Sequence, residues 1–215
     1  MNGAQSLVQT LVNCGVEVCF ANPGTSEMHF VASLDAIEGI HPVLVLFEGV
    51  ATGAADGYGR MTGRPAATLL HLGPGLANGL ANLHNARRAS TPIVNIVGDH
   101  ATYHLQYDAP LTSDIVGFAR PVSNWICESK SARTVAADAA RAVQAALAAP
   151  GGIATLILPA DTAWTEADRA AQPLPMPGKI TVADQAIAGA VELLKNGKRT
   201  VLLMRGSALL GAGLE

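Results

Sequence analysis

Glu48 is the residue whose type and setting most directly suggest chemistry. It follows the apolar run 43–47 and precedes the small residues Gly49 and Ala51. A carboxylate at the end of a buried strand loses hydration and needs a compensating partner, and such a group can share or donate a proton near neutral pH. The alternative is an acid at a helix N-terminus that interacts with the amides of the first turn. The local sequence leaves both interpretations open.

A turn motif, Asn-Pro-Gly-Thr-Ser-Glu at 22–27, opens onto a helical pattern. Thr25 or Ser26 is the expected N-cap of that helix, and Glu27 lies too close to either residue to complete a capping box. Taken alone, this motif predicts helix capping.

A second motif, Gly-Pro-Gly at 73–75, predicts a tight turn after a strand. His71 stands just before this turn, at the predicted strand end. A histidine in this place is either structural or a proton relay, since imidazole changes charge near neutral pH. The sequence contains neither GxGxxG nor a P-loop, so no phosphate-binding loop is predicted.

The elements that must position these residues alternate between short apolar runs and longer helical stretches. Strands are expected at 16–20, 43–47, 66–70, 93–97, 122–126 and 153–158, and helices at 4–14, 26–37, 49–61, 76–88, 113–118 and 135–148. This alternation predicts an α/β fold with a parallel sheet and helices on both faces. Ligands of such sheets gather at the carboxyl ends of the strands. The turns after Phe20, Phe47 and Leu70 are therefore expected to share one edge.

The composition changes after the last of these strands. Residues 1–165 are expected to form one domain, and the proline-containing stretch 166–182 an extended linker. Residues 183–215 are expected to begin a second α/β domain that is incomplete, with a helix at 183–194 and a strand at 200–204.

Charge and cysteine content exclude several classes of function. The formal net charge is −3 and no stretch concentrates Lys or Arg, so a nucleic-acid partner is not expected. The sequence has neither a signal-peptide pattern nor an 18-residue apolar stretch, so neither a signal peptide nor a transmembrane helix is predicted. Cys14, Cys19 and Cys127 lack CxxC spacing and are expected to be reduced core thiols of a cytoplasmic protein. No metal site is predicted.

Several motifs together resemble the thiamine-diphosphate-dependent enzymes that act on 2-oxo acids, a family that includes acetolactate synthase and benzoylformate decarboxylase. The matching motifs are NPGT at 22–25, EGVATGAADGYGRMTG at 48–63, GPGLAN at 73–78, DIVG at 114–117 and RPV at 120–122. The resemblance covers about residues 3–165. It implies that this part is the pyrimidine-binding domain of the family and that the segment from 183 begins its middle domain.

The resemblance also implies roles for individual residues. Glu48 would hydrogen-bond the pyrimidine ring nitrogen of thiamine diphosphate and stabilise the imino tautomer, whose exocyclic nitrogen removes the thiazolium C2 proton. Thr25 and His71 resemble the Ser and His that face the substrate in benzoylformate decarboxylase. The pyrimidine pocket would be lined by Asn22, Pro23, Gly24, Pro74 and Asn78.

Two departures from the family pattern limit these expectations. Acetolactate synthases carry Phe-Gln-Glu just before the DIVG match, whereas this chain has Pro-Leu-Thr at 110–112, which argues against a true acetolactate synthase and its FAD. The family holds the diphosphate and Mg²⁺ through a GDG…N motif of a C-terminal domain, and Gly-Asp-His at 98–100 is not that motif. The chain alone is therefore expected to be inactive.

In the family, active sites form between the pyrimidine domain of one subunit and the diphosphate domain of another. A homodimer or homotetramer that acts on a 2-oxo acid is therefore expected. The alternatives are a non-catalytic module that keeps the fold, and a split subunit that needs a separate diphosphate-binding partner.

Overall fold

A six-stranded parallel sheet forms the centre of residues 1–176. The computed structural model describes residues 1–178 and 181–209, and the chain divides after Met176 into two units. The strands are β1 (Val18–Asn22), β2 (His41–Leu44), β3 (Ala66–Leu70), β4 (Ile93–Asp99), β5 (Trp125–Glu128) and β6 (Ile153–Pro159). Their order across the sheet is β2-β1-β3-β4-β6-β5, and every neighbouring pair is parallel.

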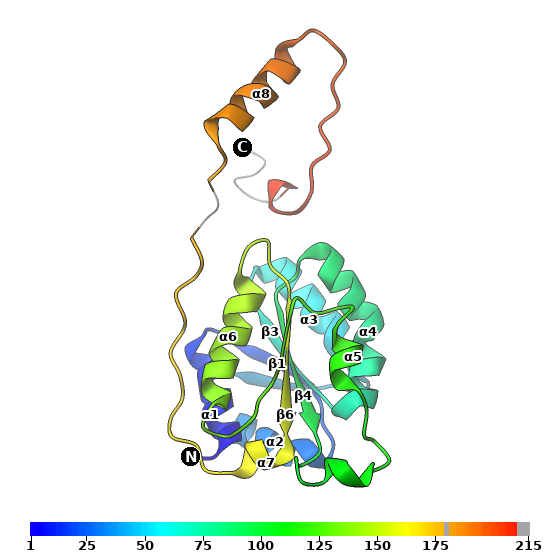
Figure 1. The fold of residues 1–215 in the computed structure, drawn as a ribbon, viewed down its shortest axis with the longest axis vertical. Coiled ribbons are helices and arrows are strands. Elements are labelled where there is room, and N and C mark those ends of the chain that lie inside the picture. The colour runs from blue at the N-terminus through cyan, green and yellow to red at the C-terminus, as the bar shows by residue number, and fades with distance from the viewer. Residues whose placement is uncertain (179–180, 210–215) are drawn as a thin grey trace. The chain divides into compact units, whose positions relative to one another are not determined.

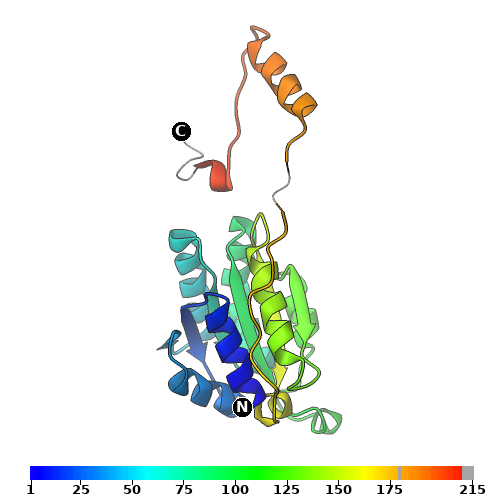
Figure 2. The same ribbon diagram turned by 90° about the vertical axis from the view of Figure 1, so that its left-hand side faces the viewer.

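Helices cover both faces of this sheet, as the alternating pattern predicts (Figures 1 and 2). The helices of this unit are α1 (Gly3–Asn13), α2 (Met28–Ala36), α3 (Glu48–Thr62), α4 (Leu72–Ala89), α5 (Ile115–Ala119), α6 (Val135–Leu147) and α7 (Ala160–Trp164). One core joins the sheet to α1, α2 and α6, and the other joins it to α3, α4 and α5. The predicted fold class is confirmed.

Helix α1 illustrates how local sequence sets these elements. The Asn2 side chain accepts a hydrogen bond from the Gln5 backbone N–H at 2.8 Å, and the Gln5 side chain accepts from the Asn2 N–H at 2.9 Å. This capping box fixes the start of the helix. Leu7 and Leu11 lie four residues apart on one face and are fully buried. The chain leaves the helix through Gly15, whose φ of 81° is left-handed.

Two of the local predictions that differ from the structure concern segments with a proline. The Gly-Pro-Gly motif at 73–75 is not a separate tight turn, because helix α4 begins at Leu72 and contains it. Pro74 is tolerated there since first-turn amides have no partner within the helix. Strand β2 lies earlier than expected and includes Pro42. It is an edge strand, where proline costs no ladder hydrogen bond if its nitrogen faces away from the sheet.

The three cysteines are free thiols. Cys19 on β1 is buried, and burial raises the pKa of its thiol to about 12. Cys14 and Cys127 are half-buried, and burial also raises their pKa values. The prediction of core thiols is confirmed for Cys19 and holds in part for the other two.

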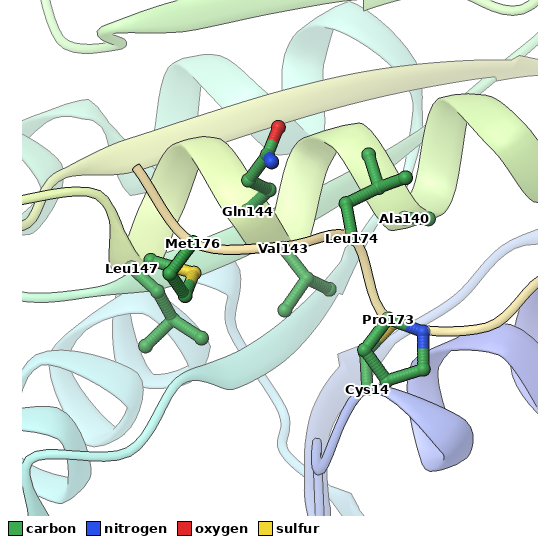
Figure 3. A pocket seen from close by; sticks show the side chains of 8 residues that line it. All are labelled: Cys14, Ala140, Val143, Gln144, Leu147, Pro173, Leu174 and Met176. Carbon is green, nitrogen blue, oxygen red and sulfur yellow. The ribbon is translucent and has the colours of Figure 1, made fainter. Parts of the chain in front are cut away.

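Residues 168–176 run along helices α1 and α6 and complete the first unit. The Asn13 side-chain amide donates to Ala171 O at 2.8 Å, and the Gln144 amide donates to Pro175 O at 2.6 Å. Figure 3 shows the apolar groove beneath this segment, lined by Cys14, Ala140, Val143, Gln144, Leu147, Pro173, Leu174 and Met176. This part of the expected linker is therefore docked on the domain.

The second unit, as far as it is described, contains helix α8 (Asp184–Lys195) and the short 3-10 helix η3 (Gly206–Leu209). The strand predicted at 200–204 is wrong, because these residues form no ladder with any described segment. A lone apolar run is not a strand until another strand satisfies its backbone. The predicted helix at 183–194 is confirmed within one residue at each end.

Candidate cofactor-binding site

The segments that follow β1, β2 and β3 lie at one edge of the sheet. The three strands are parallel neighbours, with Ala21 opposite Leu44 and Asn22 opposite Leu70. The Asn22 side-chain amide donates to Val45 O at 3.2 Å and ties the end of β1 to the segment that leads to Glu48. The prediction that these turns share one edge is confirmed.

Glu48 is the first residue of α3 and is 8% exposed. Its Oε2 accepts a hydrogen bond from the Asn78 side-chain amide of α4 at 2.9 Å. Its Oε1 lies against Gly75, where an added Cβ would stand 2.9 Å from this oxygen. Glu48 is thus both the helix N-terminal acid and a buried carboxylate held by a second helix. The structure therefore shows both the buried position and the helix N-terminal position of this acid.

Close packing of α3 on α4 holds this carboxylate in place. Thr52 Oγ1 lies 3.1 Å from Glu48 O and 3.2 Å from Gly79 O, so one hydroxyl reaches the backbone of both helices. The Asn82 side-chain amide donates to Gly49 O at 2.6 Å. A Cβ at Gly79 would lie 2.7 Å from the Thr52 methyl group, so a larger residue would separate the helices. The small residues of both helices therefore set the position of Glu48.

His71, the N-cap of α4, forms a second polar cluster together with Glu27. Its Nδ1 lies 2.7 Å from Oε2 of Glu27, which ends the 3-10 helix η1 (Thr25–Glu27). The same oxygen accepts the backbone N–H of Gly24 at 2.7 Å. Gly24 is therefore the N-cap, and the expectation of Thr25 or Ser26 at this position is wrong. Glu27 is too close to those two residues for a capping box, but it stands three residues after Gly24 and reaches back to its N–H. The missed signal is the three-residue spacing between Gly24 and Glu27.

The first turn of α4 connects the two polar clusters. The Gly75 N–H donates to His71 O at 2.8 Å, while the Gly75 Cα packs on Glu48. Between them, the fully buried Leu72 has a left-handed φ of 55°. This conformation costs a non-glycine residue about 1–2 kcal/mol, and such strain is concentrated at functional sites.

Three further predicted residues, Thr25, Pro74 and Pro23, lie at the same edge and are more exposed to solvent than Glu48. Thr25 begins η1 and is exposed, and Pro74 is exposed in the first turn of α4. Pro23 is half-buried between β1 and η1. The structure thus brings Asn78 to Glu48 and Gly24 to His71, and it leaves Thr25 and Pro74 facing outward.

Asp99, at the end of β4, is a further acid that the sequence did not single out as chemically special. Burial raises the pKa of its carboxyl, and the His100 N–H, which donates to it at 2.7 Å, opposes that shift. Within residues 1–178 and 181–209, no group of three or more His, Cys, Asp or Glu residues is placed to hold a metal ion. No helix in the same part of the chain is long and apolar enough to cross a membrane.

Comparison with known proteins identifies the family of this domain. Residues 1–118 match the family described as "Thiamine pyrophosphate enzyme, N-terminal TPP binding domain". This match covers more than half of the chain and includes β1, β2, β3, Glu48 and His71. The chain therefore belongs to the thiamine pyrophosphate enzyme family, as the motifs indicate.

Individual relatives agree with this assignment. The whole chain is 56% identical, over 214 residues, to "Putative acetolactate synthase large subunit IlvX" of Mycobacterium tuberculosis, and it spans 41% of that protein. It is 32% identical over 177 residues to benzoylformate decarboxylase of Pseudomonas aeruginosa, which covers 82% of this chain and 32% of the relative. The chain thus spans well under half the length of these relatives.

A solved structure shares the fold. The thiamine diphosphate-dependent 4-hydroxybenzoylformate decarboxylase of Rhodococcus jostii RHA1 matches with a TM-score of 0.82 over 91% of this chain and 38% of that chain. The two sequences are 23% identical in this match. The likeness therefore supports the parallel α/β architecture.

Proposed function

We propose that this chain supplies the pyrimidine-binding side of the active site in a thiamine-diphosphate-dependent decarboxylase or carboligase that acts on 2-oxo acids. The observation that supports the proposal is the buried Glu48 carboxylate, since Glu48 is 8% exposed and accepts a hydrogen bond from the Asn78 side-chain amide. It lies at the carboxyl edge of the parallel sheet, where ligands of such folds bind. A buried carboxylate held by one neutral amide is suited to move a proton. The family membership of the chain supplies the identity of the cofactor.

The Glu48 carboxylate and the Asn78 amide beside it fit the aminopyrimidine half of the cofactor. When bound, thiamine diphosphate supplies an electron sink at the carbonyl carbon of the substrate. Glu48 would hold a proton between its carboxylate and the pyrimidine ring nitrogen. Asn78 fixes Oε2, which leaves Oε1, beside Gly75, as the oxygen that we assign to this exchange.

The surrounding residues would shape the pocket. Asn22, Pro23, Gly24 and Pro74 are proposed to line the pyrimidine site from the β1 and β3 ends of the sheet. His71 and Thr25 are proposed to face the 2-oxo acid. His71 is suited to exchange a proton with the substrate because a neutral imidazole has one nitrogen that donates and one that accepts a hydrogen bond.

The proposed function also implies a domain organisation and partners for this chain. Residues 1–165 would form the pyrimidine domain, 166–182 the linker, and 183–215 the start of a middle domain. The diphosphate and Mg²⁺ would be held by a separate domain in a homodimer or homotetramer. FAD is not part of the proposal, because Pro-Leu-Thr at 110–112 replaces the acetolactate synthase motif.

Turnover of a panel of 2-oxo acids tests this function. The assay uses a polypeptide that joins this chain to a diphosphate-binding domain, with thiamine diphosphate and Mg²⁺. General acid–base groups contribute on the order of 10²–10⁴-fold, so Glu48→Gln is expected to lower kcat by at least about 10²-fold. The control is Glu38→Gln, which replaces an exposed acid. Failure of the cofactor-bound wild-type protein to turn over any 2-oxo acid would contradict the proposal, as would full activity of Glu48→Gln.

A further inference from the structure

Glu27 is a buried acid that the proposed chemistry at Glu48 does not use. It is 1% exposed, and its Oε2 meets both His71 Nδ1 and the Gly24 N–H at 2.7 Å. Its Oε1 is buried and has no hydrogen-bond partner among the described residues. A buried carboxylate is costly unless it is paired, so this arrangement requires the bond to His71.

The backbone of two neighbouring segments packs closely against the side chains of Glu27 and His71. On β4, a Cβ at Gly98 would lie 1.7 Å from Glu27 Oε1, so any side chain there would displace the carboxylate. On the other side, a Cβ at Gly24 would lie 2.2 Å from His71 Cε1. Two glycines from separate segments thus hold the carboxylate and the imidazole against each other.

We propose that Glu27 is a positioning residue that keeps the proton of neutral His71 on Nδ1 and leaves the Nε2 lone pair for the site. A neutral imidazole carries one N–H, and the partner of one nitrogen determines the role of the other. An ionised carboxylate only accepts hydrogen bonds, so Nδ1 is the nitrogen that must donate to Glu27.

This inference rests on the proposed role of His71 and adds a direction to its proton transfer. Nε2 would accept a proton from the substrate side, and the imidazolium that forms would be paired with Glu27. Return of the proton from Nε2 restores the starting state. The ring is suited to this exchange because 24% of the His71 side chain is exposed, whereas that of Glu27 is fully buried.

The tautomer of His71 can be measured directly in the 215-residue chain without cofactor. The chain is labelled with ¹⁵N-histidine, and His71→Asn identifies the signals of His71 at a pH where the ring is neutral. The expected wild-type spectrum has a protonated Nδ1 and an unprotonated Nε2. Glu27→Ala is expected to move the proton toward Nε2, which the free side chain prefers. Glu27→Gln is expected to restore Nδ1–H, because the amide oxygen still accepts.

Two further variants separate positioning from general disruption. Ser26→Ala changes the same short helix and is expected to leave the tautomer unchanged. Gly98→Ala keeps the carboxylate but displaces it, and is expected to shift the tautomer in the direction of Glu27→Ala. If Glu27→Ala does not fold, the wild-type spectrum and Gly98→Ala decide the question.

The proposal is overturned if wild-type His71 carries its proton on Nε2, or if folded Glu27→Ala or Gly98→Ala retains Nδ1–H. Loss of turnover in Glu48→Gln leaves this result unaffected, because the tautomer is read in the absence of cofactor. A failed tautomer test, conversely, leaves the role of Glu48 standing.

Discussion

Helices α1 and α8 have similar lengths and similar amphipathic patterns, yet they meet different surroundings. In α1, Leu7 and Leu11 are fully buried against the sheet and α6. In α8, Ile187 is 51% exposed and Leu194 is 49% exposed. The sequence pattern is therefore sufficient to predict a helix, but it does not show whether the apolar face has a partner.

The same contrast separates two apolar runs. Strand β4 (Ile93–Asp99) pairs with β3 and β6 on its two sides and is buried along most of its length. The run 200–204 has no described ladder partner, and Leu203 within it is 99% exposed. Neighbouring strands, and not the apolar residues alone, turn such a run into a strand.

Amide hydrogen exchange should show the largest difference between the two regions. Amides of β4 are expected to exchange only through global unfolding, with protection of at least about 10³-fold. Amides of α8 are expected to exchange with little protection, because this helix has no buried residue. Mass spectrometry of peptides from both segments measures the ratio. Comparable protection in α8 and β4 would show that α8 is packed in solution.

Paired leucine substitutions should show the next largest effect. Leu11→Ala leaves a cavity in the core beneath α1 and is expected to lower the free energy of unfolding by about 2–5 kcal/mol. Leu194→Ala in α8 is expected to change it by less than about 0.5 kcal/mol. Urea denaturation of both variants provides the measurement. Equal losses would contradict the difference in burial.

The pH dependence of stability should show the smallest effect. Burial raises the pKa of Asp99 above its ordinary value of 3.8, so the folded chain binds this proton more tightly than the unfolded chain. The contribution of Asp99 to stability is therefore fully present below pH 3.8 and is lost as the pH rises through the raised pKa. Asp99→Asn is expected to remove this loss in urea titrations across that range.

Asp184→Asn is the matched control for Asp99→Asn, since it replaces an exposed acid in α8. Its stability curve is expected to run parallel to that of the wild-type chain. A curve for Asp99→Asn that also stays parallel would show that burial at the end of β4 has no consequence for ionisation.

The fold class and the shared sheet edge could be predicted because alternating strands and helices leave few arrangements for a parallel sheet. The start of α4 could not be predicted, because a Gly-Pro-Gly sequence is equally compatible with an isolated turn and with the first turn of a helix. The role of Glu27 could not either, since it depends on contacts with His71 and Gly98, which lie far along the chain. Local spacing reveals caps but not such contacts.

Glu48 is proposed to activate the aminopyrimidine of thiamine diphosphate. The most direct test of this role is the rate of hydrogen–deuterium exchange at cofactor C2, followed by NMR after rapid quenching. The protein joins this chain to a diphosphate-binding domain, in wild-type form and as Glu48→Gln. Exchange is expected to be at least about 10²-fold slower in the variant. An unchanged exchange rate, with the cofactor bound equally well, would contradict this role.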